Sequence, residues 1–359
     1  MSFTLDDLGW SPRFEAAFEP HRAAGLTPAR VSLEHTHIYR VLTPDGERLA
    51  RVAGRLRHAA GGRADFPAVG DWVAIDAHAT GGDARIQAIL PRVSRFSRRA
   101  AGDPTEEQVV AANVDVVFLI SGLDHDFNPR RIERYVLTAW NSGASPVIVL
   151  NKVDLVDDVQ PFVDDVTPIA QGAPIVTVSA KRPGSAAAMR AHLGRGRTAA
   201  LLGSSGVGKS SLANALIGEE RLRTREVREN DSRGRHTSTN RQLILLGHDG
   251  ILIDTPGMRE LQLWDTGEAL AGAFGDVEAL AGSCRFRDCR HAEEPGCAVL
   301  AAVESGALDR GRLESYRKLQ QEQAYQATQQ DQRAQLEQKR RFKVLTKAAN
   351  KIMKEKQDR

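Results

Sequence analysis

The sequence predicts an α/β domain with a mostly parallel sheet, preceded by a small β-barrel and followed by a helical segment that carries a metal-ligand cluster. Three observations predict this architecture. Short β-type runs separated by turns occupy residues 31–91, compact apolar runs alternate with helix-like segments from about residue 106, and all three cysteines lie between residues 284 and 297. Apolar strands that alternate with helices are typical of a parallel sheet covered on both faces.

The composition fits a soluble chain of two or three domains. The chain has 359 residues, of which 41% are apolar and 26% charged,. It contains no run of about eighteen apolar residues, which argues against a membrane span. Its first residues, MSFTLDDLGW, lack the basic and apolar regions of a signal peptide,. We therefore expect a cytoplasmic protein with no membrane partner.

Changes in pattern along the chain suggest four segments. We expect an N-terminal extension over 1–30, a barrel over 31–100 with its first strand from about Val31, the α/β domain over 106–272, and a metal-binding domain with a basic helical tail over 273–359. An OB-like barrel is one candidate among small barrels, since periodicity alone does not choose between them.

Residues 203–210, GSSGVGKS, fit the phosphate-loop pattern and lie between an apolar run and the helix-like SLANALIG,. Glycines let the backbone wrap a phosphate, Lys209 can reach the terminal phosphates, and the Ser210 hydroxyl can ligate Mg²⁺. A glycine-rich turn that binds no phosphate is the alternative. Here, however, the lysine and the serine lie at the spacing of the motif, between a predicted strand and a predicted helix. The expected contacts are Gly203, Ser204, Ser205, Gly206, Val207, Gly208, Lys209, Ser210 and Ser211.

Downstream, the apolar run of GILIDTPG ends in an acid. Asp254 is placed to hold the magnesium shell, and the Gly257 N–H to meet the γ-phosphate,. The next residue is Met258, where many GTPases have a glutamine that orients the attacking water. The polar stretch 230–240 offers His236 as a catalytic group beside Lys209, and either Thr237 or Thr239 as a magnesium ligand. A lone histidine in a polar loop is, however, more often a solvated bystander.

The base-recognition residues come earlier in the chain. Asn151, Lys152 and Asp154 follow the apolar run 145–151, at a strand end where open α/β sheets bind ligands,. A carboxylate at Asp154 can accept from two guanine N–H donors that adenine lacks, which favours GTP over ATP. Ser179 and Ala180 resemble the companion loop, with the Ala180 N–H meeting the guanine oxygen. Because these motifs precede the phosphate loop, the order indicates a circularly permuted P-loop GTPase domain.

The cysteines and one histidine form the pattern Cys284-x₄-Cys289-x-His291-x₅-Cys297. Three thiolates and an imidazole would make a closed tetrahedral zinc site. With every position filled by protein, such a zinc ion would be structural. Basic runs lie at 92–100 and at 339–359, where nine Lys or Arg face two acids. Runs of this kind can bind phosphates, although alone they more often mark a solvated face or tail.

Taken together, NKVD, VSA, GSSGVGKSS, GRHTST, DTPG and the cysteine pattern resemble the RsgA (YjeQ) family of ribosome small subunit-dependent GTPases; VGDWV and RRAAGDPTEEQVVAANVD do too. The resemblance covers nearly the whole chain. It implies an OB-fold, a permuted GTPase domain and a zinc domain, with 30S-stimulated GTP hydrolysis in late 30S maturation. It also implies contact with 16S rRNA, binding and release controlled by the nucleotide state, and a catalytic His236. We expect a monomer.

Three other functions stay open from the residues alone. The chain could be a GTPase that acts on a different RNA or RNP, with its nucleotide state controlling binding in the same way. A nucleotide kinase or ATP-driven enzyme could share the phosphate loop, although NKVD argues against it. A zinc-containing RNA-binding protein could carry an inactive nucleotide domain, but the intact Lys209, Ser210 and Asp254 make that improbable.

Overall fold

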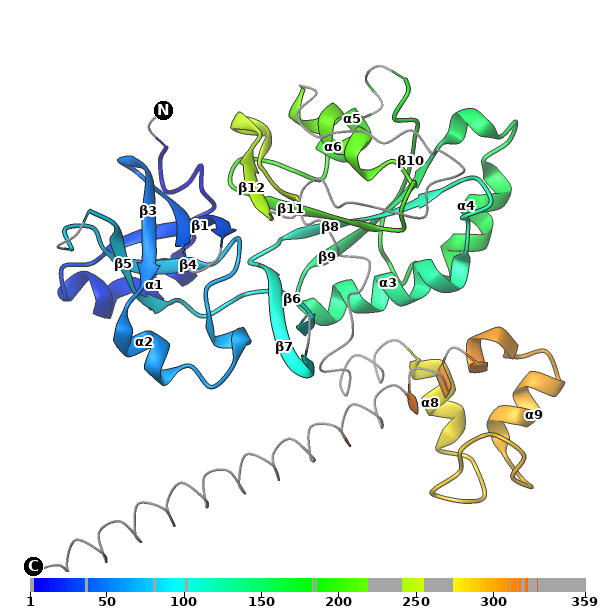
Figure 1. Cartoon of the computed structure of the whole chain (residues 1–359). Helices are drawn as coiled ribbons and strands as arrows, with labels where there is room; N and C mark the ends of the chain where they lie inside the picture. The colour runs from blue at the N-terminus through cyan, green and yellow to red at the C-terminus, as the bar shows by residue number, and fades with distance from the viewer. Residues whose placement is uncertain are drawn as a thin grey trace, which may run out of the picture. The chain divides into compact units, whose positions relative to one another are not determined.

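The structure is a computed structural model (Figure 1). It describes residues 3–35, 38–79, 82–100, 103–182, 184, 186–218, 241–254, 274–308, 310–314, 316–317, 320–321 and 328. The chain divides into two compact units. One contains residues 1–101 and 106–263, and the other contains residues 102–105 and 264–359.

Five strands near the N-terminus close into a barrel. They are β1 (Thr27–His35), β2 (Ile38–Thr43), β3 (Gly46–Val52), β4 (Trp72–Asp76) and β5 (Ala84–Ile89). The order is β1-β2-β3-β5-β4, and β4 pairs again with β1. Only the β3–β5 pairing is parallel. Helix α2 (Gly54–Ala59) and the 3₁₀ turn η1 (Arg63–Asp65) lie between β3 and β4. The expected barrel is confirmed, and its strand order fits an OB-like fold.

A helix in the N-terminal segment differs from the expectation of a simple extension. Helix α1 (Pro12–Ala23) buries Phe14 and Phe18, and β1 begins at Thr27 rather than near Val31. The Trp10 ring lies 4.6 Å from that of Trp72, a fully buried barrel residue. Aromatic burial therefore holds this segment on the barrel, because large rings remove much apolar surface from water.

The second part of this unit is a six-stranded sheet region in the order β10-β9-β8-β11-β13-β12. Its strands are β8 (Val116–Gly122), β9 (Ser145–Asn151), β10 (Ile175–Val178), β11 (Thr198–Gly203), β12 (Gln242–Leu245) and β13 (Ile251–Asp254). Only β12 runs antiparallel to its neighbour β13. A hairpin of β6 (Arg95–Ala100) and β7 (Asp103–Ala112) connects the barrel to β8.

Helices cover both faces of this sheet (Figure 1). Helices α3 (Pro129–Ser142) and α4 (Gln160–Val166) pack on one face, and α5 (Ala187–Arg190) and α6 (Lys209–Ile217) on the other. The 3₁₀ turns η2 (Val153–Leu155), η3 (Thr167–Ile169) and η4 (Gly247–Asp249) complete the connections. All seven residues of β8 are buried, as the continuous apolar run predicts for a strand covered on both faces.

The chain changes direction between β8 and β11. From β8 it proceeds outward through β9 to β10, and from β11 it proceeds the other way to β13. Open α/β sheets bind ligands outside the carboxyl ends of the strands at such a reversal. The ends of β8, β9, β10, β11 and β13 therefore define the functional edge of the sheet.

Barrel and sheet are joined through β1. Leu33 of β1 pairs with Gln242 of β12, which makes one sheet of 11 strands. The buried Arg30 guanidinium donates to Thr198 Oγ1 at 2.8 Å and to the Asn113 carbonyl at 3.1 Å. It also reaches the carbonyls of Leu8 and Gly70. A buried hydrogen bond to a charged group is worth about 1.5–3 kcal/mol, so the bonds of Arg30 favour one arrangement of the two parts.

The other unit contains α8 (Gly275–Ala281) and α9 (Ala298–Glu304), followed by helical residues 310–314. Phe274, Val299 and Tyr316 are buried in its core. The Phe274 and Tyr316 rings lie 5.4 Å apart, and Arg312 pairs with Asp276. The first part of the long polar helical stretch thus packs on this small core. The basic run 339–359 lies outside the described residues.

Candidate functional site

The predicted phosphate loop connects β11 to α6. Three of its glycines have positive φ: Gly203 at 159°, Gly206 at 78° and Gly208 at 96°. A Cβ at Gly203 would lie 2.3 Å from the Ile120 carbonyl oxygen. The backbone therefore adopts a path that other residues would not follow, and it ends at the N-terminus of a nine-residue helix. That combination is suited to an anion.

Two charged residues of the predicted phosphate and metal site lie together. The Lys209 ammonium donates to the Gly203 carbonyl at 2.7 Å and to the Ser204 carbonyl. Asp254 ends the neighbouring strand β13. Burial raises the pKa of Asp254 above its usual value, and the positive charge of Lys209 partly opposes that rise. A half-buried carboxylate close to Lys209, in the first turn of α6 that also carries Ser210, is a fitting donor for a magnesium ion,.

Asn151 connects the base-recognition segment to the phosphate loop. It ends β9, and its side-chain amide donates to the Val207 carbonyl at 2.7 Å. Its Oδ1 accepts from the backbone N–H of Ala180 at 3.1 Å. A single buried side chain thus ties together three loops that sequence analysis placed in one site. A polar group buried in this way fixes the geometry of a site, because leaving one of its hydrogen bonds unmade would cost folding free energy.

The predicted base-reading carboxylate lies in the same loop cluster. Asp154 Oδ1 accepts a bond from the Ser179 hydroxyl at 2.5 Å, and Asp154 Oδ2 lies 3.5 Å from the Lys181 ammonium. The bond from Ser179 lowers the pKa of Asp154 below its usual value. The carboxylate is therefore ionised at neutral pH, the state in which it accepts from two N–H donors.

Sequence reasoning missed one partner of this loop. The Lys152 ammonium pairs with Asp124, which lies in the turn after β8. No local pattern marks Asp124, because its role depends on two strands that are neighbours only in the fold. The predicted residues His236, Thr237, Thr239 and Gly257 lie outside the described residues.

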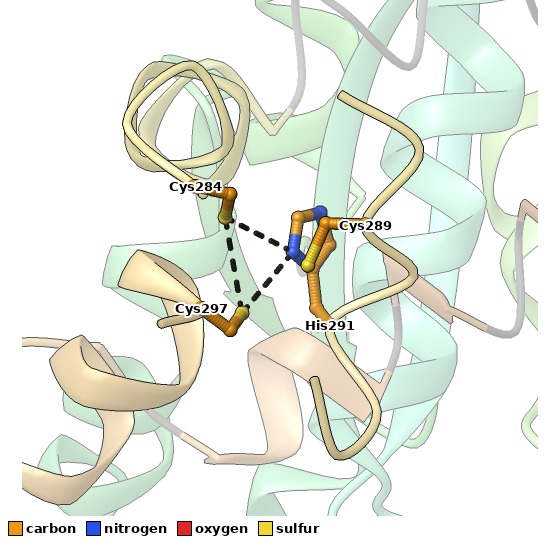
Figure 2. A group of neighbouring side chains, drawn as sticks. All are labelled: Cys284, Cys289, His291 and Cys297. Atoms are coloured by element: carbon orange, nitrogen blue, oxygen red, sulfur yellow. Dashed lines mark hydrogen bonds between the residues drawn. The ribbon is translucent and has the colours of Figure 1, made fainter. Parts of the chain in front are cut away.

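The predicted metal ligands gather in the second unit (Figure 2). The donor atoms of Cys284, Cys289, His291 and Cys297 all lie within 4.8 Å of one another. Cys284 Sγ lies 3.8 Å from Cys297 Sγ and 3.6 Å from His291 Nδ1. The distance between Cys297 Sγ and His291 Nδ1 is 3.4 Å. A tetrahedron with bonds of about 2.3 Å has edges of roughly 3.8 Å. These separations fit a four-coordinate metal ion.

The surrounding backbone supports this cluster. Cys297 caps α9, and its sulfur accepts from the Leu300 N–H at 3.4 Å. Burial disfavours the Cys284 thiolate, but bonds from the Val299 and Ala298 amides outweigh it, and the pKa of Cys284 lies below its usual value. The amide bonds to Cys284 favour its thiolate, the form that binds a metal, whereas burial raises the pKa of Cys289 to about 11,.

One member of the basic run 92–100 has an internal partner. Arg92 forms a two-pronged ion pair with the fully buried Asp71, at 2.9 and 2.8 Å, and also donates to the carbonyls of Ala64 and Phe66. We expected this run as a whole to be able to bind phosphates; Arg92 is instead committed to the barrel. Arg95 is exposed.

Comparison with known proteins gives the family. A family described as "RsgA GTPase" matches residues 89–264, and one described as "50S ribosome-binding GTPase" matches residues 198–347. The small ribosomal subunit biogenesis GTPase RsgA of Opitutus terrae is 50% identical over 335 residues, which cover 90% of this chain and 91% of that protein. The chain belongs to the RsgA GTPase family. The RsgA protein of Xanthomonas axonopodis pv. citri is 46% identical and covers 89% of this chain and 88% of its own.

Two solved structures agree with this chain in fold. YjeQ from Thermotoga maritima has a TM-score of 0.59 at 27% identity, covering 82% of this chain and 97% of its own. YloQ, described as a circularly permuted GTPase, has a TM-score of 0.55 at 24% identity, with coverages of 86% and 96%. The predicted permuted GTPase fold is thereby confirmed. Among the described residues, no helix is long and apolar enough to cross a membrane.

Proposed function

We propose that this chain hydrolyses GTP to GDP and phosphate during late maturation of the 30S ribosomal subunit, with the nucleotide state controlling its binding and release. The observation that carries the nucleotide half of the proposal is Asn151, which joins the phosphate loop to the base-recognition loops. The subunit half rests on the relatives, which are named small ribosomal subunit biogenesis GTPases. A cytoplasmic location accompanies this proposal, since ribosomal subunits are assembled there.

The residues take the following proposed roles. The loop 203–208 and Lys209 bind the phosphates, Asn151 and Asp154 bind guanine, and the Ala180 N–H meets the guanine oxygen. Ser210, Asp254 and either Thr237 or Thr239 would hold Mg²⁺, which neutralises phosphate charge when bound. Gly257 would contact the γ-phosphate, and His236 would orient the attacking water in place of the glutamine that Met258 replaces.

We further propose that the cysteine cluster holds one structural zinc ion. Its four donors leave no coordination position for a substrate, so the ion would stabilise the second unit and take no part in hydrolysis,.

The loop that carries the cysteines exposes arginines beside the 41%-exposed Phe286, and Arg285 lies over that ring at 5.6 Å. Arginine next to an exposed aromatic ring suits unpaired RNA bases and phosphates.

The barrel supports the same class of partner. Exposed arginines lie on β3 and α2, namely Arg48, Arg55 and Arg57. A small β-barrel with clustered positive charge is a common platform for RNA. Contact with 16S rRNA by a monomer is our proposal for these surfaces.

The test is GTP turnover by the purified chain alone, with 30S subunits and with 50S subunits. We expect a low basal rate that rises at least tenfold with 30S only, because the site lacks the usual water-orienting glutamine. Competition by ATP should be negligible, since adenine offers Asp154 no pair of donors. An ATP affinity equal to that for GTP would favour a kinase-like enzyme. A rate that neither subunit changes would favour action on another RNP.

A further inference from the structure

An ion pair links the ends of two neighbouring strands at the base-recognition loop. The Lys152 ammonium donates to Asp124 Oδ2 at 2.5 Å, and the two side chains are 24% and 16% exposed. Lys152 directly follows β9, and Asp124 lies two residues beyond the end of β8. The Leu123 N–H also donates to the Asn151 carbonyl at 2.8 Å. The pair is therefore part of a bonded connection between the two strand ends.

The surroundings hold this pair in one geometry. The Asp126 N–H donates to Asp124 Oδ1 at 3.1 Å, which orients the carboxylate. A Cβ at Gly122 would lie 2.9 Å from Asp124 Oδ1 and 3.4 Å from Lys152 Cδ, so the glycine leaves the space that both side chains use. Lys152 itself has a left-handed backbone with φ of 68°. Residues with a side chain keep that conformation only where the surroundings enforce it.

The ion pair neutralises the charge of Lys152 and fixes this residue, which lies between Asn151 and Asp154 in the sequence. It therefore restrains the loop that carries both of the proposed base-binding residues. Burial works against the Asp124 carboxylate, but bonds from Lys152 and the Asp126 amide outweigh it and lower the pKa of Asp124. The carboxylate stays ionised at neutral pH. A loop loses conformational entropy when a ligand orders it, and a tether that orders the loop beforehand removes that loss from binding.

We propose that Asp124 is a positioning residue for the guanine base: through Lys152 it holds the loop that carries Asn151 and Asp154 in the geometry that binds the base. This inference rests on the proposed function. It assigns Asp124 to the base end of the nucleotide, away from the phosphates. Its loss should therefore affect GDP and GTP alike and leave the chemical step unchanged.

The test compares Asp124→Asn with the wild type. Asparagine has the same shape and can still accept from the Asp126 amide, but it lacks the charge. We expect the Kd values for GDP and GTP to rise by the same factor, about threefold to tenfold, with kcat unchanged. The matched control is Asp126→Asn in the same turn, whose carboxylate pairs with Arg131 at 2.9 Å. That variant should bind both nucleotides like the wild type.

A second arm uses Lys152→Met, which keeps an apolar side chain without the ammonium. In that background, adding Asp124→Asn should change either Kd by less than about twofold, because the partner is gone. Additive losses, an equal loss in Asp126→Asn, or a loss for GTP without one for GDP would overturn the inference. So would unchanged Kd values in Asp124→Asn. Failure of the wild type to bind any guanine nucleotide would instead overturn the proposed function.

Discussion

Asp254 lies where burial opposes its own charge. Its pKa is raised in the folded chain, with Lys209 giving partial compensation. When folding raises the pKa of an acid, ionisation of that acid destabilises the folded chain. This destabilisation is absent at pH values below the pKa that the acid has in the unfolded chain. It grows as the pH rises towards the folded value and is complete at higher pH. At neutral pH, the nucleotide-free protein therefore carries a cost in stability that Lys209 offsets only in part, and a metal ion at this carboxylate would offset more of it.

At the scale of this residue we predict opposite effects on stability and activity. Asp254→Asn should raise the melting temperature of the nucleotide-free protein, because the substitution removes a charge that burial disfavours,. GTP turnover should fall at least tenfold, since an amide is a poor magnesium ligand. Calorimetry and phosphate release measure the two effects. The exposed Asp157→Asn should change neither, and a lower melting temperature for Asp254→Asn would refute the argument.

At the scale of the elements, the N-terminus of α6 and the end of β9 leave no room between them. A Cβ at Gly208 would lie 2.3 Å from Asn151 Nδ2, and Gly208 has a φ of 96°. Gly208→Ala should therefore displace Asn151 from the Val207 carbonyl and from the Ala180 amide. Because both loops are disturbed, we expect the affinities for GDP and GTP to fall more than tenfold.

Gly218→Ala at the other end of α6 is the matched control. Gly218 also has a positive φ, 79°, but its Cβ would meet nothing within 4 Å. This variant should carry the backbone strain alone, with nucleotide affinity within about twofold of the wild type. Titration with a fluorescent guanine nucleotide compares the two. Equal affinities in both variants would show that the close contact with Asn151 does not matter.

Elements with a strong internal pattern could be predicted from the sequence, and contacts between distant segments could not. The apolar runs of β8, β9 and β11 and the glycines of the phosphate loop carry their signal locally. Helix α1 was missed because Pro20 lies within it and only Phe14 and Phe18 mark its buried face. The roles of Arg30 and Asp124 depend on partners brought together only by folding. Sequence analysis therefore picked out loops that the fold brings together, but missed the bonds that hold them.

At the scale of the whole molecule, the two compact units should respond differently to metal removal. The predicted ligands Cys284, Cys289, His291 and Cys297 belong to one unit, and the predicted nucleotide-site residues that the structure describes belong to the other. After chelation and return to magnesium buffer, we expect the three thiols to become reactive while basal GTP turnover stays within about twofold. A thiol reagent and phosphate release measure this. Complete loss of basal turnover would contradict it.

Strand β1 belongs to the barrel and also lies along β12, at the edge of the nucleotide sheet. An uncovered edge strand exposes N–H and C=O groups to which another chain can add, and natural proteins hide such edges. The barrel therefore shields this part of the catalytic sheet from self-association, in addition to any contact it makes with RNA. A version of this enzyme trimmed to residues 106–272 would bare that edge, and its first failure in solution should be aggregation rather than weak nucleotide binding.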